Sequence, residues 1–172
     1  MVPQENSARH FKHVGLSAAT GLAALLVCSH PASASSSTTP VPEPEAVFEL
    51  VARQTQISSI DVDGSSGPSQ GDEIVVSGDL IFGSATVGNF GEVCTMTRTA
   101  PLDEFDLQCA GSLTLAQGQI TFQGQFTVTG AGPGDINFAI TGGTGSYKTA
   151  RGFIHAANVS DTDTQLTVHL IR

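Results

Sequence analysis

The sequence contains no tryptophan, one tyrosine and only seven lysine and arginine residues among its 172 positions. Sixteen aspartates and glutamates outnumber these cations, so the formal net charge is −9. Because such a surface repels phosphate backbones and anionic lipids, nucleic acid is not expected as a partner. The residue spacings typical of zinc sites are missing, and so is the G-x-S-x-G elbow of serine hydrolases. No metal site is therefore predicted.

An apolar run long enough to span a membrane is missing as well. The run near the N-terminus, fifteen residues from Val14, is shorter than the roughly 20 that a spanning helix needs. It follows basic residues and precedes small ones, the layout of a secretory signal peptide. We therefore predict a signal peptide over 1–34, cleaved after about Ala34, and a secreted product. Residues 35–46, rich in Ser, Thr, Pro and Glu, are predicted as a flexible linker before one domain over 47–172.

That domain lacks a convincing amphipathic helix, and its recurring pattern has period two. In QITFQGQFTVTG, residues 119–130, apolar Ile120, Phe122 and Val128 share one face and polar residues the other. Runs of this kind predict eight strands, over 47–60, 73–82, 86–98, 105–115, 119–130, 135–141, 150–159 and 164–171. Clusters of glycine and proline between them supply the turns.

Eight strands joined by short turns can hide their apolar faces in two ways, as a closed barrel or as a sandwich. Closure also removes exposed strand edges, which favours the barrel. The predicted fold is therefore all-β, an eight-stranded antiparallel up-and-down β-barrel. A barrel of this size is filled by side chains or holds one small ligand.

The two cysteines that follow the signal peptide, Cys94 and Cys109, predict a disulfide, because they form an even pair in an exported chain. If they face each other across a hairpin, Met96, Arg98 and Phe105 lie on the same face as the cysteines. That face is apolar apart from Arg98, so the disulfide is predicted to point into the barrel. Closing this loop contributes roughly 3 kcal/mol to stability in the chain-entropy model.

Four segments, VGNFGEVC, FDLQCAG, GQITFQGQF and FAITGGTGSYKTARG, resemble the allene oxide cyclase barrel family in order and spacing. Dirigent proteins are a more distant likeness, and the similarity covers about residues 47–172. The resemblance implies a calycin-type barrel with an apolar pocket in its lumen and no cofactor. Plant members of the family cyclise an unstable fatty-acid epoxide, and bacterial barrels of similar build cyclise polyketide chains, including by (4+2) cycloaddition.

The functional residues of the plant enzymes carry over only in part. The first-strand glutamate matches Glu49, and a cysteine matches Cys94. The pocket tyrosine matches Phe126, however, and two asparagines fall at Val51 and Gly78. Most of the polar set is missing, so the resemblance implies the fold and not the allene oxide reaction itself.

Two residues are predicted to be catalytic, Glu49 and Arg98, which would polarise a carbonyl or orient a polar end group. If Glu49 points inward, burial disfavours its charged form and marks it as a site residue. The alternative is a solvated carboxylate on the outer face. The residues predicted to shape the pocket are Met96, Phe105, Phe122, Phe126 and Tyr147.

The glycine-rich stretch ITGGTGSYKTARG, residues 140–152, is predicted to be a tight hairpin at the barrel rim. A phosphate site needs glycines that open a helix, whereas these lie between two strands. Tyr147 is expected to fold over the barrel end, and Gly152 to ease a bend in the next strand.

The expected function is that of an exported, cofactor-independent cyclase or isomerase acting on a linear, largely apolar substrate such as a polyketide or an oxidised lipid. The alternative is a non-catalytic secreted barrel that binds a hydrophobic ligand or serves as a scaffold. A monomer or weak dimer is expected, because an outer face of Thr and Gln suits exposure better than a hydrophobic interface.

Overall fold

The computed structural model describes residues 44–99 and 103–171. The predicted signal peptide over 1–34 and nearly all of the predicted linker over 35–46 lie outside the described residues. In the part of the chain that is described, no helix has the length and hydropathy needed to cross a lipid bilayer.

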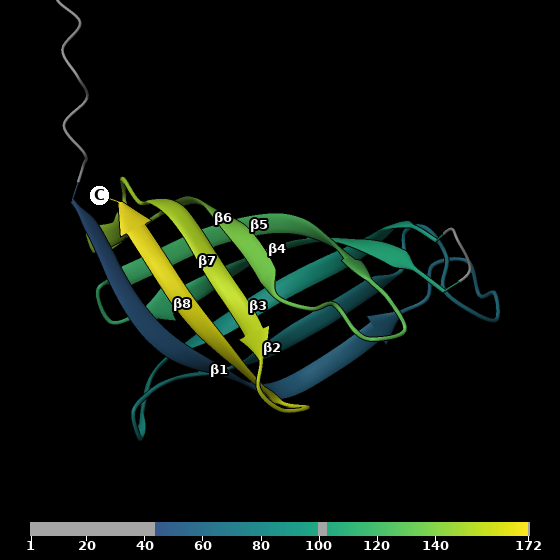
Figure 1. Cartoon of the computed structure of the whole chain (residues 1–172), viewed down its shortest axis with the longest axis horizontal. Coiled ribbons are helices and arrows are strands. Elements are labelled where there is room, and N and C mark those ends of the chain that lie inside the picture. Colours follow the sequence, from purple (N-terminus) through teal and green to yellow (C-terminus); the bar gives the residue numbers. More distant parts are fainter. Residues whose placement is uncertain (1–43, 100–102, 172) are drawn as a thin grey trace, which may run out of the picture. The chain divides into compact units, whose positions relative to one another are not determined.

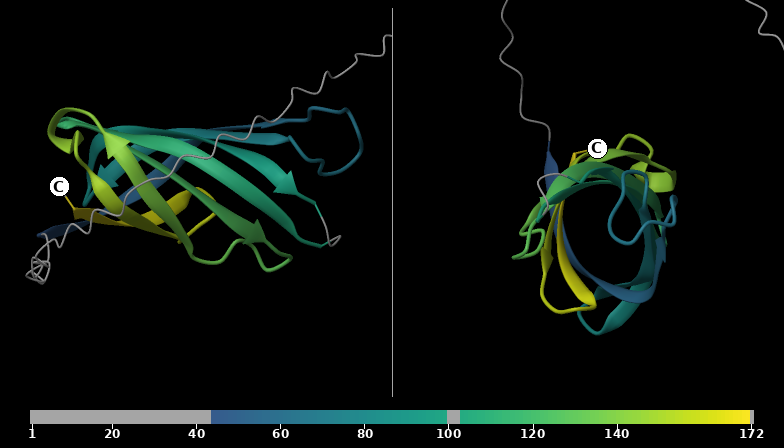
Figure 2. Two further views of the ribbon diagram at one scale, coloured as in Figure 1. Left: turned by 90° about the horizontal axis from the view of Figure 1, so that it is seen from above. Right: turned by 90° about the vertical axis from the view of Figure 1, so that its right-hand side faces the viewer.

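Eight strands and one short 3-10 helix form the described structure. They are β1 (Glu45–Ile60), β2 (Glu73–Phe82), β3 (Ala85–Arg98), β4 (Phe105–Leu115), β5 (Gly118–Val128), β6 (Ile136–Gly143), η1 (Gly145–Tyr147), β7 (Arg151–Asn158) and β8 (Asp163–Ile171). Each strand pairs antiparallel with the next, and β1 pairs with β8 (Figure 1). The right-hand view of Figure 2 looks along the resulting ring of strands. The closed up-and-down barrel is therefore confirmed.

Alternation along each strand sends apolar side chains into the barrel, as period-two patterning requires. In β5, Ile120 and Phe122 are buried, and in β8 Leu166 and Val168 are buried. Outward neighbours such as Gln123 are exposed. The two strands predicted over 119–130 and 164–171 and their buried faces are therefore confirmed.

The predicted disulfide is present between Cys94 on β3 and Cys109 on β4, which face each other directly in the register. Both cysteines are buried, so the bridge lies inside the barrel as expected. Two residues further along each strand, Met96 pairs with Leu107, and both side chains are buried on the inward face.

The register then shifts by one residue between Met96 and Arg98, so that Arg98 faces Asp106 instead of Phe105. An extra residue in one strand reverses the side to which the following side chains point. Arg98 therefore turns outward, and its Nη2 donates to Asp106 Oδ1 at 2.8 Å. The inward position predicted for Arg98 is wrong for this reason.

The glycine-rich stretch forms the connection from β6 through η1 to β7 at one end of the barrel. It contains a 3-10 turn rather than a tight hairpin. Gly145 has a φ of 58°, and a Cβ there would lie 2.3 Å from the Gln117 carbonyl oxygen. Gly152 has a φ of 124°, and a Cβ there would lie 2.0 Å from the His169 carbonyl oxygen. Tyr147 is buried at this end, where its hydroxyl lies 3.4 Å from Gln117 Oε1.

Candidate active site in the barrel lumen

The barrel lumen contains a cavity of about 520 Å³, within the ~300–1,000 Å³ usual for small-molecule sites. Its wall is mostly apolar and is built from inward residues of all eight strands. Its mouth is formed by residues 131–133, between β5 and β6, and residues 160–162, between β7 and β8. The apolar strand residues of this wall are Ala52, Ile74, Val76, Phe90, Leu107, Leu113, Phe122, Phe126, Val128, Ile136, Phe138, Ile154, Ala156 and Leu166.

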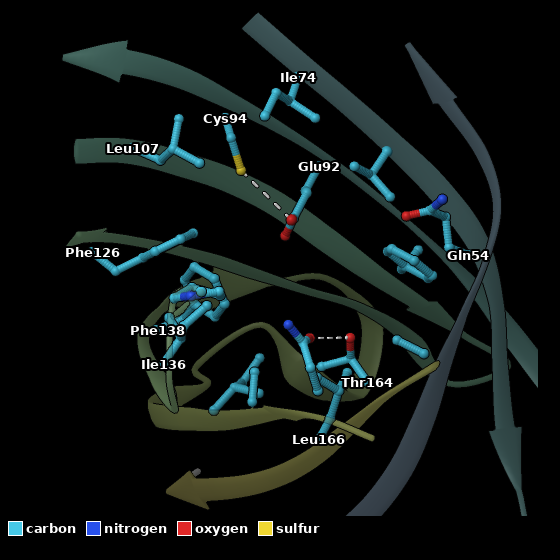
Figure 3. Close-up of a pocket in the computed structure, with 18 of the residues that line it drawn as sticks. Gln54, Ile74, Glu92, Cys94, Leu107, Phe126, Ile136, Phe138, Thr164 and Leu166 are labelled. Carbon is cyan, nitrogen blue, oxygen red and sulfur yellow. Dashed lines mark hydrogen bonds between the residues drawn. The ribbon is translucent and has the colours of Figure 1, made fainter. Parts of the chain in front are cut away.

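Within this apolar wall, Glu92 of β3 projects a carboxyl group into the cavity (Figure 3). Burial raises the pKa of the Glu92 carboxyl from its usual value of 4.5 to about 7. One carboxyl oxygen, Oε1, lies 3.6 Å from Cys94 Sγ of the disulfide. At neutral pH the group is therefore divided between a protonated form that donates a hydrogen bond and an ionised form that accepts a proton.

The strands beside β3 leave room for this carboxyl group. Glu92 pairs with Val76 on β2 and with Gly111 on β4, and Gly111 pairs in turn with Phe122 on β5. A Cβ at Gly111 would lie 2.6 Å from Phe122 Cζ and 2.7 Å from Glu92 Cβ. The absence of a side chain at Gly111 therefore leaves space for the Glu92 side chain on one side and the Phe122 ring on the other.

Aromatic rings form the wall on the side of β5 and β6. The Phe138 ring lies 5.1 Å from that of Phe122 and 6.1 Å from that of Phe126, in tilted and edge-on arrangements. Such contacts are typical of rigid aromatic clusters. They give the cavity a firm apolar surface against which a ligand can pack.

A second polar region lies nearer the mouth of the cavity. Thr164 Oγ1 donates to Asn158 Oδ1 at 2.9 Å, and Gln54, whose backbone N–H donates to the Thr162 carbonyl at 2.8 Å, also lines the cavity. Figure 3 shows Thr164 across the cavity from Glu92. A ligand with two polar groups could thus be held at both.

The structure divides the residues predicted for the pocket. Phe122 and Phe126 line the cavity. Met96 is buried in the core and Phe105 packs against the core, but neither side chain lines the cavity. Tyr147 lines a second hollow at the opposite end of the barrel, near the β2–β3 and β4–β5 turns.

The two residues predicted to be catalytic do not line the lumen. Glu49 is exposed on the outer face, because its neighbours Phe48 and Leu50 take the inward positions of β1. The inward orientation considered for Glu49 is therefore wrong, as it is for Arg98. The residue that the sequence interpretation missed is Glu92. Its signal was present, because Glu92 stands two positions before Cys94 and so shares the face of an inward disulfide.

Glu92 and the two cysteines place a carboxyl oxygen and two sulfur atoms within 4.8 Å of one another. Metal-binding cysteine is a thiolate, whereas these sulfur atoms are joined in a disulfide. The residues present therefore do not suit a metal ion in this state.

The class of protein defined by these features is a closed β-barrel whose mostly apolar lumen cavity carries one inward carboxyl group. The family model for the allene oxide cyclase barrel like domain matches residues 51–170, and the chain belongs to this family. Among curated protein sequences, none matches this chain.

Three solved structures illustrate the range of similar barrels. A pyocyanin demethylase is 25% identical over 73% of this chain and 99% of its own, with a TM-score of 0.63. AbnU, an exo-specific intermolecular Diels-Alderase, is 15% identical over 76% of this chain and 98% of its own, with a TM-score of 0.61. The pterocarpan synthase dirigent protein GePTS1 is 15% identical over 75% of this chain and 88% of its own, with a TM-score of 0.55.

Proposed function

We propose that this protein is a cofactor-independent cyclase or isomerase that binds an apolar small molecule in the barrel lumen and uses Glu92 as its acid and base. The observation that carries the proposal is the lumen carboxyl group whose pKa burial raises to about 7. A general acid or base is most effective when its pKa lies near the working pH. Glu92 thus takes the role predicted for Glu49.

The chemistry follows from the two protonation states of Glu92. The neutral carboxyl donates a hydrogen bond to a carbonyl oxygen and so polarises it for ring closure or cycloaddition. The carboxylate removes a proton from carbon or nitrogen and returns it elsewhere on the same molecule, which is an isomerisation. The apolar wall holds a flexible substrate in a reactive conformation and limits the access of water.

The similar solved structures support a small-molecule reaction without fixing which one. Their names cover a demethylase, a Diels-Alderase and a dirigent protein on one barrel. Since one fold carries several chemistries, the reaction must be argued from the residues in the lumen. Proton transfer and carbonyl polarisation are the steps that Glu92 can perform.

Export belongs to the same proposal. The buried disulfide supports it, because disulfides persist mainly in oxidising compartments. Mass spectrometry of the intact protein recovered outside the cell tests export directly. We expect a mature chain that begins at Ser35, and an intact N-terminus would contradict the predicted cleavage.

The test of the proposed function uses a substrate that needs only a base in an apolar site, a nitrobenzisoxazole. The carboxylate takes the ring C–H proton, the electron pair of that bond forms the nitrile, and the N–O bond breaks to leave a coloured phenolate. The proton on Glu92 then passes to water, which restores the carboxylate. The rate should increase with pH through about 7 as Glu92 ionises. Glu92→Gln should lower kcat/KM at least about 100-fold, the lower end of general-base effects.

The matched control is Glu49→Gln, which changes an exposed carboxylate on the outer face by the same atoms. It should retain the wild-type rate and pH profile. A wild-type rate no higher than that of Glu92→Gln would overturn the proposal, and the chain would then be better described as the non-catalytic binding barrel.

A further inference from the structure

The lining of the lumen cavity has charged groups of one sign only. Among the described residues, those that line it include the carboxylates Glu92 and Asp161 and no lysine, arginine or histidine. Glu92 lies within the apolar wall, whereas Asp161 is exposed at the mouth. A ligand entering this cavity therefore meets a carboxyl group at both levels, and the one at Glu92 is negatively charged above about pH 7.

The cations of the barrel lie elsewhere. Arg53 forms an ion pair with Asp163 at 2.8 Å, and Arg98 pairs with Asp106, both through exposed guanidinium groups. Lys148 follows η1 at the opposite end of the barrel. These cations do not line the cavity.

The groups that face Glu92 from neighbouring strands carry no charge. Its register partners are Val76 and Gly111, and the next inward position on β3 and β4 holds the disulfide between Cys94 and Cys109. Among the described residues that line the cavity, none therefore supplies a cation to an ionised Glu92 in this apolar wall. A cationic group on a ligand would supply the missing partner, and an anionic group would add repulsion at low dielectric.

We propose that the lumen selects apolar molecules that carry a basic nitrogen, that this nitrogen forms an ion pair with Glu92, and that molecules ending in a carboxylate are rejected. The inference rests on the proposed function, because it names the substrate class of the same site. Of the substrates predicted from the sequence, an oxidised lipid with a free acid group is thereby disfavoured.

The surrounding side chains suit such a ligand. The rings of Phe122, Phe126 and Phe138 form a cluster on the wall beside β5 and β6. Aromatic faces attract cations as well as apolar surface, so they stabilise both the protonated nitrogen and the apolar body of such a ligand. Thr164 and Asn158 are available for a second polar group closer to the mouth.

The experiment compares three probes of one shape, naphthylmethylamine, naphthylmethanol and naphthoic acid, by isothermal titration calorimetry with the full chain at pH 8. The amine should bind at least about tenfold more tightly than the alcohol, as expected for a charge-assisted contact. The acid should bind more weakly than the alcohol. Because Glu92 is ionised above about pH 7, the preference for the amine should decrease as the pH is lowered to 5.

Two variants complete the design. Glu92→Gln should abolish the preference for the amine over the alcohol, and Glu49→Gln should keep the preference of the wild type. Equal binding of amine and alcohol, or tighter binding of the acid, would overturn this inference and leave the proposed function standing. If none of the three probes binds, both the inference and the lumen site on which it rests are wrong.

Discussion

The carboxyl group of Glu92, half-buried in the lumen wall, makes the stability of the barrel depend on pH in a way that one substitution removes. In the folded protein its pKa is about 7, against a usual value of 4.5. Each pKa unit corresponds to about 1.4 kcal/mol, so the shift amounts to about 3 kcal/mol. The folded state binds the proton more tightly than the unfolded chain does. The stabilisation is therefore complete below about pH 4.5 and is lost as the pH rises to about 7.

Glu92→Gln replaces this group with a neutral one of nearly the same shape. The free energy of unfolding of the variant minus that of the wild type should increase by about 3 kcal/mol between pH 4 and pH 8. The assay is urea unfolding at several pH values, followed by far-UV circular dichroism because the chain has no tryptophan. All other carboxyl groups are common to both proteins, so their titration cancels in the difference.

A difference for Glu92→Gln that stays flat between pH 4 and pH 8 would refute the reasoning. It would mean that water or a partner solvates Glu92 in the folded state, so that burial does not raise its pKa.

Three further predictions concern the framework of the site. The double variant Cys94→Ala, Cys109→Ala should lose roughly 3 kcal/mol of unfolding free energy. A thiol titration of the unfolded, unreduced wild type should find neither of these two cysteines free, and finding both free would contradict the disulfide. Arg98 and Thr127 hold the pKa of Asp106 at about 2, so Asp106→Asn should remove a stabilisation that is present above about pH 4 and lost as the pH falls, and an unchanged acid-unfolding curve would count against it. Gly111→Ala forces a Cβ to 2.6 Å from Phe122 Cζ, so it should lower the Tm and weaken probe binding. Gly130→Ala is the control, because a Cβ there would have no atom within 4 Å, and it should change neither quantity. Equal effects of the two substitutions would show that the space at Gly111 does not shape the lumen.

The barrel could be predicted because each strand carries its own evidence. Alternation of apolar and polar residues identifies the buried face of β5 and β8 within a few residues of sequence, and glycine-rich turns mark the ends. The pairing of Cys94 with Cys109 then fixes the register of β3 against β4. Local pattern and pairing agree, so little tertiary information was needed.

The position of Arg98 could not be predicted in the same way. A single extra residue on β3 turns it outward, and a bulge of this kind has no consistent sequence pattern. On β1 the faces were ambiguous because Val47 and Val51 share the side of Glu49. There the packing of Phe48, Leu50 and Ala52 into the core decides the orientation.

The inward position of Glu92 follows from its spacing to Cys94, whereas the family resemblance pointed to Glu49. The cavity beside Glu92 was not predictable, because its volume depends on how small residues from different strands meet. Gly111 leaves room for Glu92 and Phe122, and Ala52 and Ala156 line the same space. Such a sum of side-chain volumes appears only when the barrel is closed.

The most direct test of the account is the pKa of Glu92 itself, measured by carbon NMR of protein labelled at the glutamate carboxyl groups. The resonance that disappears in Glu92→Gln identifies the group. We predict a midpoint near 7 for this resonance, as burial in the lumen requires. A midpoint near the usual 4.5 would contradict both the buried carboxyl group and the acid–base function built on it.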